Sequence, residues 1–492
     1  MRKYKIPFLL FLLTPVFYSL RLGSLSLWGD EVSTLNFTST LERIAADRFH
    51  PPLYYALLFL FRQASGEGET LLRLFSVLFA AAGVSISYLF AMRISGGNKK
   101  LSLIASLLVM TSPYLLLYSR MIRYFSMLFF AGVLVNHLFL KILDEREGLK
   151  NYLYYSLASV FLIYTDYLGG IILLIHFIHI LIIFRKTGDF DFRKILLSWL
   201  SVMILSLPVL IRLASSVLEQ KGNLFVHETQ GTLKAFFFKI AYQYSSLLTG
   251  ETMTVSAVAA MPLVLIALAV LLKKNMLSPS AGKQRLFPAI FLLSVPLLNS
   301  LITPFFVLKL PVTHVTKLSL YLIPLFYSFI LPRDFSGAPA KFAISILFAA
   351  NIYGSLNCFL GREFHNPNFA APWREIAETV SIEADEETPI IVRDNNSAFL
   401  HYYKGGGRIL NMAKIEELKR PDIGKKAILV TRNTGSENLM EIEKISKYLN
   451  ERGKIEKAYY FLPLNSLERK LKESFLNVPL PGNYIDVLIF RF

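Results

Sequence analysis

Long apolar runs separated by short basic connections constrain this chain more than any other feature. Runs such as 70–92 and 195–215 contain few charged residues. A helix rises about 1.5 Å per residue, so roughly 20 apolar residues cross the ~30 Å hydrocarbon core of a bilayer. We count about eleven such runs between residues 6 and 360, and no small-residue cleavage site follows the first, 6–20. The pattern predicts a polytopic α-helical membrane protein with an uncleaved first span.

Composition supports the same fold class and argues against others. The 492 residues are 54% hydrophobic and only 18% charged, with a mean hydropathy of +0.47. A water-soluble enzyme of this length would need a charged surface on several domains, so we exclude that class for most of the chain. The net charge of +17 could indicate nucleic acid, but many cations lie in short connections where they set topology, and we expect no nucleic-acid partner. The single cysteine, Cys358, cannot form an internal disulfide, and we expect it to be packed in a helix.

Lysine and arginine gather in alternate connections, which predicts the topology. By the positive-inside rule these connections face the cytoplasm, and the others, including 22–69 and 216–253, face outside. The N-terminus is then cytoplasmic, and an odd number of spans places the C-terminus on the outer side of the cell membrane. The cationic connections carry Arg2, Lys3 and Lys5; Arg93, Lys99 and Lys100; Arg185, Lys186, Arg193 and Lys194; Lys273, Lys274, Lys283 and Arg285; Arg333 and Lys341.

The composition changes after Leu360 to a mixed, charged pattern typical of a globular domain. Short apolar runs predict strands, and apolar residues recurring on one face of 436–451 predict a helix. We therefore expect two domains, a transmembrane domain over 1–360 and an extracytoplasmic α/β domain over 361–492. The predicted strands are 389–392, 426–431 and 484–490.

Two short motifs in the first outer connection carry the chemistry. Asp30 and Glu31 are adjacent acids directly after the first span, which fits either solvated side chains or a polar site. His50 precedes Pro51 and Pro52, whose fixed backbone angles set the histidine at a turn before an apolar run. Taken alone, this second motif is explained as well by a proline pair at a helix start.

Together these motifs resemble the GT-C superfamily of membrane glycosyltransferases, in particular its protein O-mannosyltransferase and aminoarabinose transferase branch. The resemblance covers roughly residues 1–360, and its sharp motifs are the Asp-Glu pair and His-Pro-Pro-Leu. It implies transfer of a monosaccharide from a polyprenyl-phosphate donor on the outer face. It also implies that Asp30 is the catalytic base, Glu31 its neighbour, and His50 a basic residue at the active site or donor phosphate.

A third element of the resemblance lies between two apolar runs at 118–127. Superfamily members often carry Ser-x-Glu-x-Arg-x-Tyr here, and Ser119 and Arg123 match it, whereas Met121 and Phe125 replace the glutamate and tyrosine. The match implies substrate contact by this connection, with Arg120, Arg123 and Tyr124 as the candidates. Interfacial arginines also snorkel to lipid headgroups, which remains an alternative.

Two further polar residues at span ends are candidates for substrate binding. Relatives carry an arginine seven residues before a proline at the start of a late span, and Lys317 keeps that spacing to Pro324; snorkelling is again the alternative. A lysine binds phosphate as a point charge, without the fork of an arginine. Asp166 lies between two runs, where an acid is costly unless paired, although capping of the next helix is the favoured explanation.

The implied reaction is inverting glycosyl transfer to an acceptor hydroxyl of a lipid, glycan or protein, with no cofactor and no metal. The sequence contains no HExxH, CxxC, EF-hand, Walker A or GxGxxG pattern. One alternative is a lipid-carrier flippase or transporter, against which no inverted repeat is apparent. Another is an oligosaccharyltransferase or polysaccharide polymerase, although the Trp-Trp-Asp-type motif is not found after residue 360.

Overall fold

The chain divides into two compact units in the computed structural model. The helical unit comprises 1–22, 37–252 and 257–360, and the sheet unit comprises 23–36, 253–256 and 361–492. The predicted boundary at 360 stays a prediction, although the sheet unit also takes in two short earlier segments. The structure describes residues 4–144, 148–187, 192–219, 233–276, 282–305, 316–392, 397–411, 426–432, 436–463, 467, 469–470 and 483–492.

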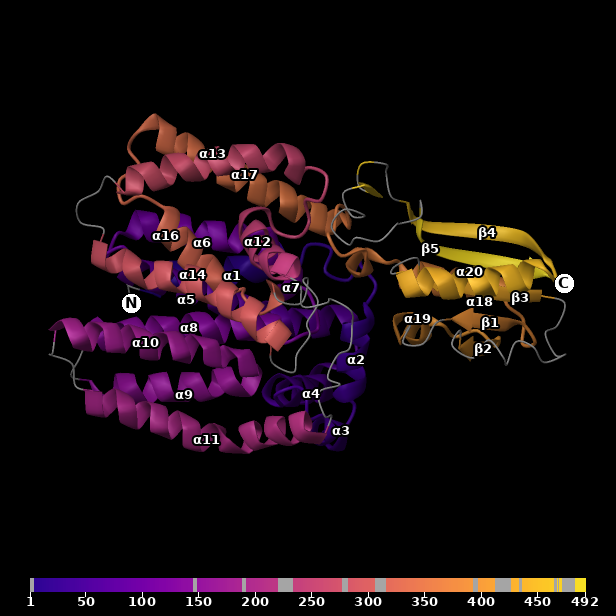
Figure 1. The fold of residues 1–492 in the computed structure, drawn as a ribbon, viewed down its shortest axis with the longest axis horizontal. Helices are drawn as coiled ribbons and strands as arrows, with labels where there is room; N and C mark the ends of the chain where they lie inside the picture. The colour runs from indigo at the N-terminus through magenta and orange to yellow at the C-terminus, as the bar shows by residue number, and fades with distance from the viewer. Residues whose placement is uncertain are drawn as a thin grey trace. The chain divides into compact units, whose positions relative to one another are not determined.

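Helices make up the helical unit and run side by side along its length (Figure 1). Pairs such as α5 and α8, or α1 and α5, pack along much of their length. The helices are α1 (Lys5–Tyr18), α3 (Leu41–Ala46), α4 (Leu53–Ser65), α5 (Glu69–Ile94), α6 (Lys99–Thr111), α7 (Pro113–Ser119), α8 (Phe125–Asp144), α9 (Leu149–Thr165), η2 (Tyr167–Gly169), α10 (Gly170–Thr187), α11 (Phe192–Glu219), α12 (Leu233–Thr249), α13 (Ala257–Met276), α14 (Gly282–Phe305), α16 (Leu322–Ile330) and α17 (Ala338–Leu360).

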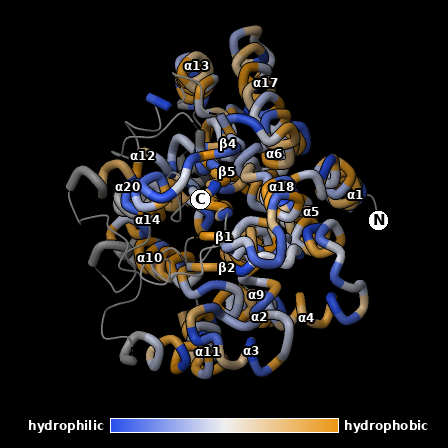
Figure 2. Tube along the Cα trace, turned by 90° about the vertical axis from the view of Figure 1, so that its right-hand side faces the viewer, coloured by the Kyte–Doolittle hydropathy of each residue, from blue (hydrophilic) through white to orange (hydrophobic). Residues whose placement is uncertain are grey.

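Several of these helices are long and apolar enough to cross a bilayer. Among the described residues five pass by length and composition, namely α5, α8, α11, α13 and α17, and the bent pair α6 and α7 makes a possible sixth. Figure 2 shows hydrophobic residues along α13 and α17. Only 17% of the most apolar window of α13 is buried, so most of that surface is available to lipid. The predicted number of eleven spans stays a prediction.

Prolines explain where two predicted spans depart from single straight helices. Ser112 is extended because it precedes Pro113, and α6 and α7 meet there at 52°. The late span predicted around Lys317 is interrupted: Thr316 and Lys317 are helical, a turn follows over 318–321, and α16 begins at Leu322 with Pro324 in its first turn, where a missing N–H is tolerated.

The cation-rich connections meet at one end of the helical unit. Arg93 pairs with Asp144 at 2.8 Å, Lys274 pairs with Asp334 at 3.2 Å, and Lys100 lies over the Phe335 ring. These contacts join the ends of α5, α8, α13 and α16. Each of them involves a cation from a connection that was predicted to be cytoplasmic. The opposite ends of α8 and α17, at Phe125 and Phe359, therefore belong to the other end of the unit. Which end faces the cytoplasm stays a prediction.

The sheet unit is built on a five-stranded mixed sheet in the order β2-β1-β3-β5-β4. β1 is parallel to β2 and β3, and β5 is antiparallel to β3 and β4. Helix α20 contributes Ile445 and Leu449 to the core that includes Leu429 and Phe490. The elements of the sheet unit are α2 (Gly29–Phe37), η4 (Pro367–Ala370), α18 (Trp373–Glu383), β1 (Pro389–Val392), α19 (Ser397–Tyr402), β2 (Arg408–Asn411), β3 (Lys426–Arg432), α20 (Ser436–Asn450), β4 (Lys454–Pro463) and β5 (Asn483–Arg491).

The three predicted strands and the predicted helix are confirmed as β1, β3, β5 and α20. The two strands that the sequence did not predict, β2 and β4, are the edges of the sheet. β4 is mostly exposed, so its residues are mixed polar and apolar and form no apolar run. Cys358 is buried in α17, as expected, and Trp373 at the start of α18 is buried too.

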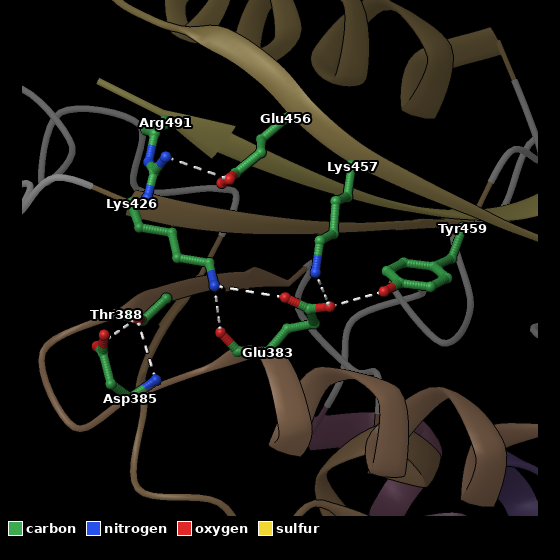
Figure 3. A network of polar contacts seen from close by, with 8 residues as sticks. All are labelled: Glu383, Asp385, Thr388, Lys426, Glu456, Lys457, Tyr459 and Arg491. Atoms are coloured by element: carbon green, nitrogen blue, oxygen red, sulfur yellow. Dashed lines mark hydrogen bonds and ion pairs between the residues drawn. The ribbon is translucent and has the colours of Figure 1, made fainter.

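Glu383, at the end of α18, ties that helix to the sheet (Figure 3). Its carboxylate accepts hydrogen bonds from Lys457 at 2.8 Å and Tyr459 at 2.6 Å on β4. Lys426 on β3 donates to the Glu383 backbone carbonyl at 2.6 Å. These hydrogen bonds, led by the one from Lys457, lower the pKa of Glu383.

Candidate functional site

Asp30 and Glu31 lie in the first turn of α2, within the sheet unit. The Glu31 side chain is buried, and its Oε2 accepts the Trp28 backbone N–H at 3.3 Å, a helix-start contact. Asp30 is half-buried, and its backbone carbonyl accepts the Thr34 hydroxyl at 2.9 Å. Leu27 N–H donates to the Tyr402 hydroxyl at 2.7 Å, and Trp28 packs edge-on against Phe369. The turn that carries both acids is therefore firmly attached to the folded sheet unit.

His50 lies in the helical unit, in the turn between α3 and α4. Its Nδ1 lies 2.8 Å from Asp47 Oδ2, and Asp47 Oδ1 accepts the Phe49 N–H at 2.9 Å. The ring packs beside Tyr55 and Tyr124, with centroids at 5.4 and 6.4 Å. Burial raises the pKa of Asp47, but the hydrogen bond and charge of His50 outweigh it and lower the pKa overall.

Arg123 and Tyr124 lie in the connection between α7 and α8. The Arg123 guanidinium lies over the Tyr124 ring at 5.5 Å and the Phe125 ring at 5.7 Å, and its side chain is buried. The side chain of Arg120, three residues earlier, contacts other residues. It donates a hydrogen bond to the Arg21 carbonyl at 2.7 Å and lies over the Phe359 ring at 4.9 Å. Of the two arginines, only Arg123 joins the group of predicted site residues in the helical unit.

Lys317 lies on the other side of this group. Its Nζ is 5.3 Å from the centroid of Phe125, the same ring that Arg123 covers, and its side chain is 3% exposed. Thr316, its neighbour, accepts a hydrogen bond at its backbone carbonyl from the Tyr114 hydroxyl. The three residues before Thr316, namely Thr313, His314 and Val315, lie outside the described residues, as do two polar residues of the long connection after α11, His227 and Glu228.

Glu251 completes the surroundings of Lys317, and the sequence did not indicate it. It follows α12, is 1% exposed, and accepts the Tyr118 hydroxyl at 2.7 Å. Burial, its largest influence, raises the pKa of Glu251, and the charge of Lys317 opposes that rise. A buried acid beside a buried lysine is an arrangement that offsets the cost of placing either charge away from water.

Asp166 is the N-cap of η2, so the favoured interpretation from sequence is confirmed. Its Oδ1 accepts the Leu168 N–H at 2.7 Å. The Tyr124 side chain acts on the pKa of Asp166, so Asp166 lies near the same group as Arg123. Burial raises the pKa of Asp166 to about 6, against the opposing hydrogen bonds from Leu168 and Tyr124.

The structure thus brings five predicted residues into one chain of contacts within the helical unit. His50 packs on Tyr124, Tyr124 lies near Asp166 and under Arg123, and Arg123 shares the Phe125 ring with Lys317. Asp30 and Glu31 belong to the other unit. Among the described residues no cluster of three histidine, cysteine, aspartate or glutamate side chains could hold a metal ion. The group in the helical unit is suited to binding an anion through buried cations held by aromatic rings.

Comparison with solved structures gives the fold. ArnT of Cupriavidus metallidurans in the apo state superposes with a TM-score of 0.56 at 13% sequence identity, over 98% of this chain and 97% of that one. ArnT bound to undecaprenyl phosphate gives a TM-score of 0.46 at 12% identity over the same shares. An oligosaccharyltransferase of Archaeoglobus fulgidus, tethered with an acceptor peptide, gives 0.46 at 11% identity, over 78% of this chain and 61% of that one.

No protein-family model and no curated protein sequence matches the chain. The similarity is therefore one of fold, at low sequence identity. In the comparison with ArnT it extends over nearly the whole of both chains. ArnT is a membrane glycosyltransferase of the GT-C fold, and its superposition in the apo state relates the fold of this chain to it. With its apolar helices, this chain is a multi-pass membrane protein that has the GT-C fold.

Proposed function

We propose that this protein is an inverting glycosyltransferase that uses a polyprenyl-phosphate-linked monosaccharide. The observation that carries the proposal is the pair of buried cations, Arg123 and Lys317, which lie over one aromatic ring, Phe125. A buried cationic pair at the end of a membrane helix suits a lipid phosphate, because the prenyl tail stays in the bilayer while the headgroup reaches the helix ends. The GT-C fold supports the same reaction class.

In the proposed reaction the acceptor hydroxyl attacks the anomeric carbon of the sugar. Asp30 takes the hydroxyl proton, and the bond between the anomeric carbon and the phosphate oxygen breaks, so that polyprenyl phosphate leaves with the bonding electrons. Arg123, Lys317 and His50 stabilise the charge that develops on this phosphate. A single displacement without a covalent sugar intermediate inverts the anomeric configuration.

The base role of Asp30 rests on the family resemblance of the Asp-Glu pair. The half-buried position of Asp30 in a well-anchored turn suits a base, since the side chain stays accessible while the backbone is held. Glu31 then supports the turn through its bond to Trp28. We propose that the reaction takes place on the extracytoplasmic face, where we also expect the C-terminal domain. The acceptor group is a hydroxyl of a lipid, glycan or protein.

A transfer assay tests this proposal. Membranes containing the wild-type protein or Asp30→Asn are given a panel of radiolabelled polyprenyl-phosphate sugars, with Asp334→Asn at the other end of the helical unit as the matched control. We expect label to move to an acceptor with the wild type and the control, and not with Asp30→Asn at equal protein level. Full transfer by Asp30→Asn would overturn the assignment of the base. Lipid crossing the bilayer without transfer would favour a transporter instead.

A further inference from the structure

A tight turn positions His50, and the side chain of Asp47 builds it. Asp47 Oδ1 accepts the backbone N–H of Phe49 at 2.9 Å and of His50 at 3.4 Å, while Oδ2 meets His50 Nδ1 at 2.8 Å. The Asp47 side chain is 8% exposed and that of His50 is 26% exposed. One carboxylate therefore fixes both the backbone and the ring of the histidine. Sequence analysis identified His50 but gave Asp47 no role.

The segment that carries this pair is held from a distant part of the helical unit. Arg212 on α11 donates to the Ile44 carbonyl at 2.7 Å, and the Ser216 hydroxyl donates to the Arg48 carbonyl at 3.0 Å. After the histidine, Pro51 and Pro52 fix the backbone before α4 begins. Because both sides of the turn are anchored, the imidazole has little freedom to change its position.

The second ring nitrogen of His50 is left available by this arrangement. The surroundings of the ring are aromatic, formed by Phe37 at 5.9 Å, Tyr55 at 5.4 Å and Tyr124 at 6.4 Å between centroids. Nε2 has no hydrogen-bond partner within the described part of the chain. With Nδ1 held by a carboxylate, an imidazolium ring at this position would present Nε2–H as a charge-assisted donor suited to an anionic oxygen.

We propose that Asp47 is a positioning residue that orients His50 through Nδ1, so that Nε2–H of His50 donates to the phosphate of the lipid-linked donor. This inference rests on the proposed function and adds a residue to it. Tyr124 packs against both His50 and Arg123, so the aromatic group also connects the dyad with the cation pair over Phe125. Asp47 acts only through His50 and touches no substrate atom.

The test uses a change that removes one contact and keeps the turn. In Asp47→Asn the amide oxygen still accepts the Phe49 N–H, but an NH₂ group faces His50 Nδ1–H and cannot accept from it. Full-length wild type, Asp47→Asn, His50→Gln and the double variant are compared for binding of undecaprenyl phosphate, measured by its effect on thermal unfolding. Asp334→Asn is the control, because Asp334 accepts the Ser336 N–H at 2.9 Å in a similar turn without a histidine.

We expect Asp47→Asn to weaken lipid-phosphate binding about tenfold and to lower kcat/KM for the donor by at least that factor, because His50 contacts the phosphate both when the donor binds and as charge develops on it. Both Asp47→Asn and His50→Gln lose the contact between the two side chains and should lower the unfolding temperature without lipid to a similar extent, so the effect of lipid is measured from each variant's own value. The double variant should bind no more weakly than His50→Gln, since Asp47 works through that ring. Wild-type affinity in Asp47→Asn, or additive losses in the double variant, would overturn the inference. Wild-type protein that neither binds the lipid nor transfers sugar would overturn the proposed function itself.

Discussion

The Tyr118 hydroxyl donates a 2.7 Å hydrogen bond to the carboxylate of Glu251, across 133 positions of the chain. Both side chains are buried. The bond joins the end of α7 to the connection between α12 and α13, and places an acid beside Lys317. The surroundings of Lys317, whose charge acts on Glu251, are therefore built from segments that are remote in sequence.

We expect Tyr118→Phe to destabilise the protein, because it removes one hydrogen bond from a buried carboxylate. Loss of a buried bond of this kind costs about 1–3 kcal/mol. Thermal unfolding in detergent should show a lower midpoint than for the wild type. Tyr154→Phe is the matched control, since Tyr154 is 51% exposed. An equal midpoint for Tyr118→Phe and Tyr154→Phe would mean that the bond adds nothing to stability.

Asp166 should make stability depend on pH. Burial raises its folded pKa from 3.8 to about 6, so between these values the folded protein binds more protons than the unfolded chain. The contribution of Asp166 to stability is therefore fully present below about pH 4 and is lost as pH rises through 6. Unfolding midpoints measured from pH 4 to 7 should fall for the wild type, and the fall should be smaller in Asp166→Asn. An unchanged slope in the variant would contradict this assignment.

Glu383 should make stability depend on pH in the opposite direction to Asp166. Its hydrogen bonds from Lys457 and Tyr459 lower its pKa in the folded state, so its contribution is present above the unfolded value of 4.5 and is lost as pH falls below it. Hydrogen exchange of β3 and β4 amides in the full-length protein measures this locally. We expect exchange to accelerate from pH 6 to pH 4, after correction for intrinsic rates, and less so in Glu383→Gln. A fall in protection of the same size in the variant would exclude Glu383 as the cause.

A directional chain of buried hydrogen bonds should stabilise the helices α8 to α11. Trp199 Nε1 donates to the Tyr155 hydroxyl at 3.2 Å, that hydroxyl lies 3.0 Å from His176 Nδ1, and His176 Nε2 lies 3.1 Å from Asn136 Oδ1. Tyr155→Phe would remove the partner of the buried His176 Nδ1, at roughly 1–3 kcal/mol, and that of the half-buried Trp199 Nε1. We expect a lower unfolding midpoint than for Tyr154→Phe, with transfer activity per folded molecule unchanged. Equal midpoints would show that the chain contributes little.

Local patterns in the sequence were sufficient for the parts of the fold that depend on local chemistry. The apolar runs predicted helices, Pro113 and Pro324 lie where two of these helices bend or begin, and Asp166 caps the helix that follows it. The strands β1, β3 and β5 were predicted because buried strands are apolar. β2 and β4 were not, since an edge strand needs no apolar run and so resembles a loop in sequence.

The candidate site was predicted only in part, for a physical reason. His50, Arg123 and Lys317 precede or follow apolar runs, where charge is conspicuous. Glu251 and Asp47 gain their roles through partners, one across 133 positions and one through the shape of a turn, and neither relationship leaves a periodic signal. Arg120 looks equivalent to Arg123 in sequence, and only the packing of its side chain on Phe359 separates the two.

Charge and shape at Arg123 should both matter for the donor. In Arg123→Gln the buried cation is removed, and in Arg123→Lys the charge stays while the planar fork that grips a phosphate is lost. We expect the donor KM to rise about tenfold for Arg123→Lys and further for Arg123→Gln, because one lost charge-assisted bond corresponds to roughly that factor. Steady-state transfer from the polyprenyl-phosphate sugar measures this. Arg93→Gln is the control, since Arg93 pairs with Asp144 at the opposite end of the helical unit and should leave the donor KM unchanged. If both arginine positions gave the same change, the effect would reflect the overall positive charge of the protein, and the phosphate-binding role of Arg123 would be withdrawn.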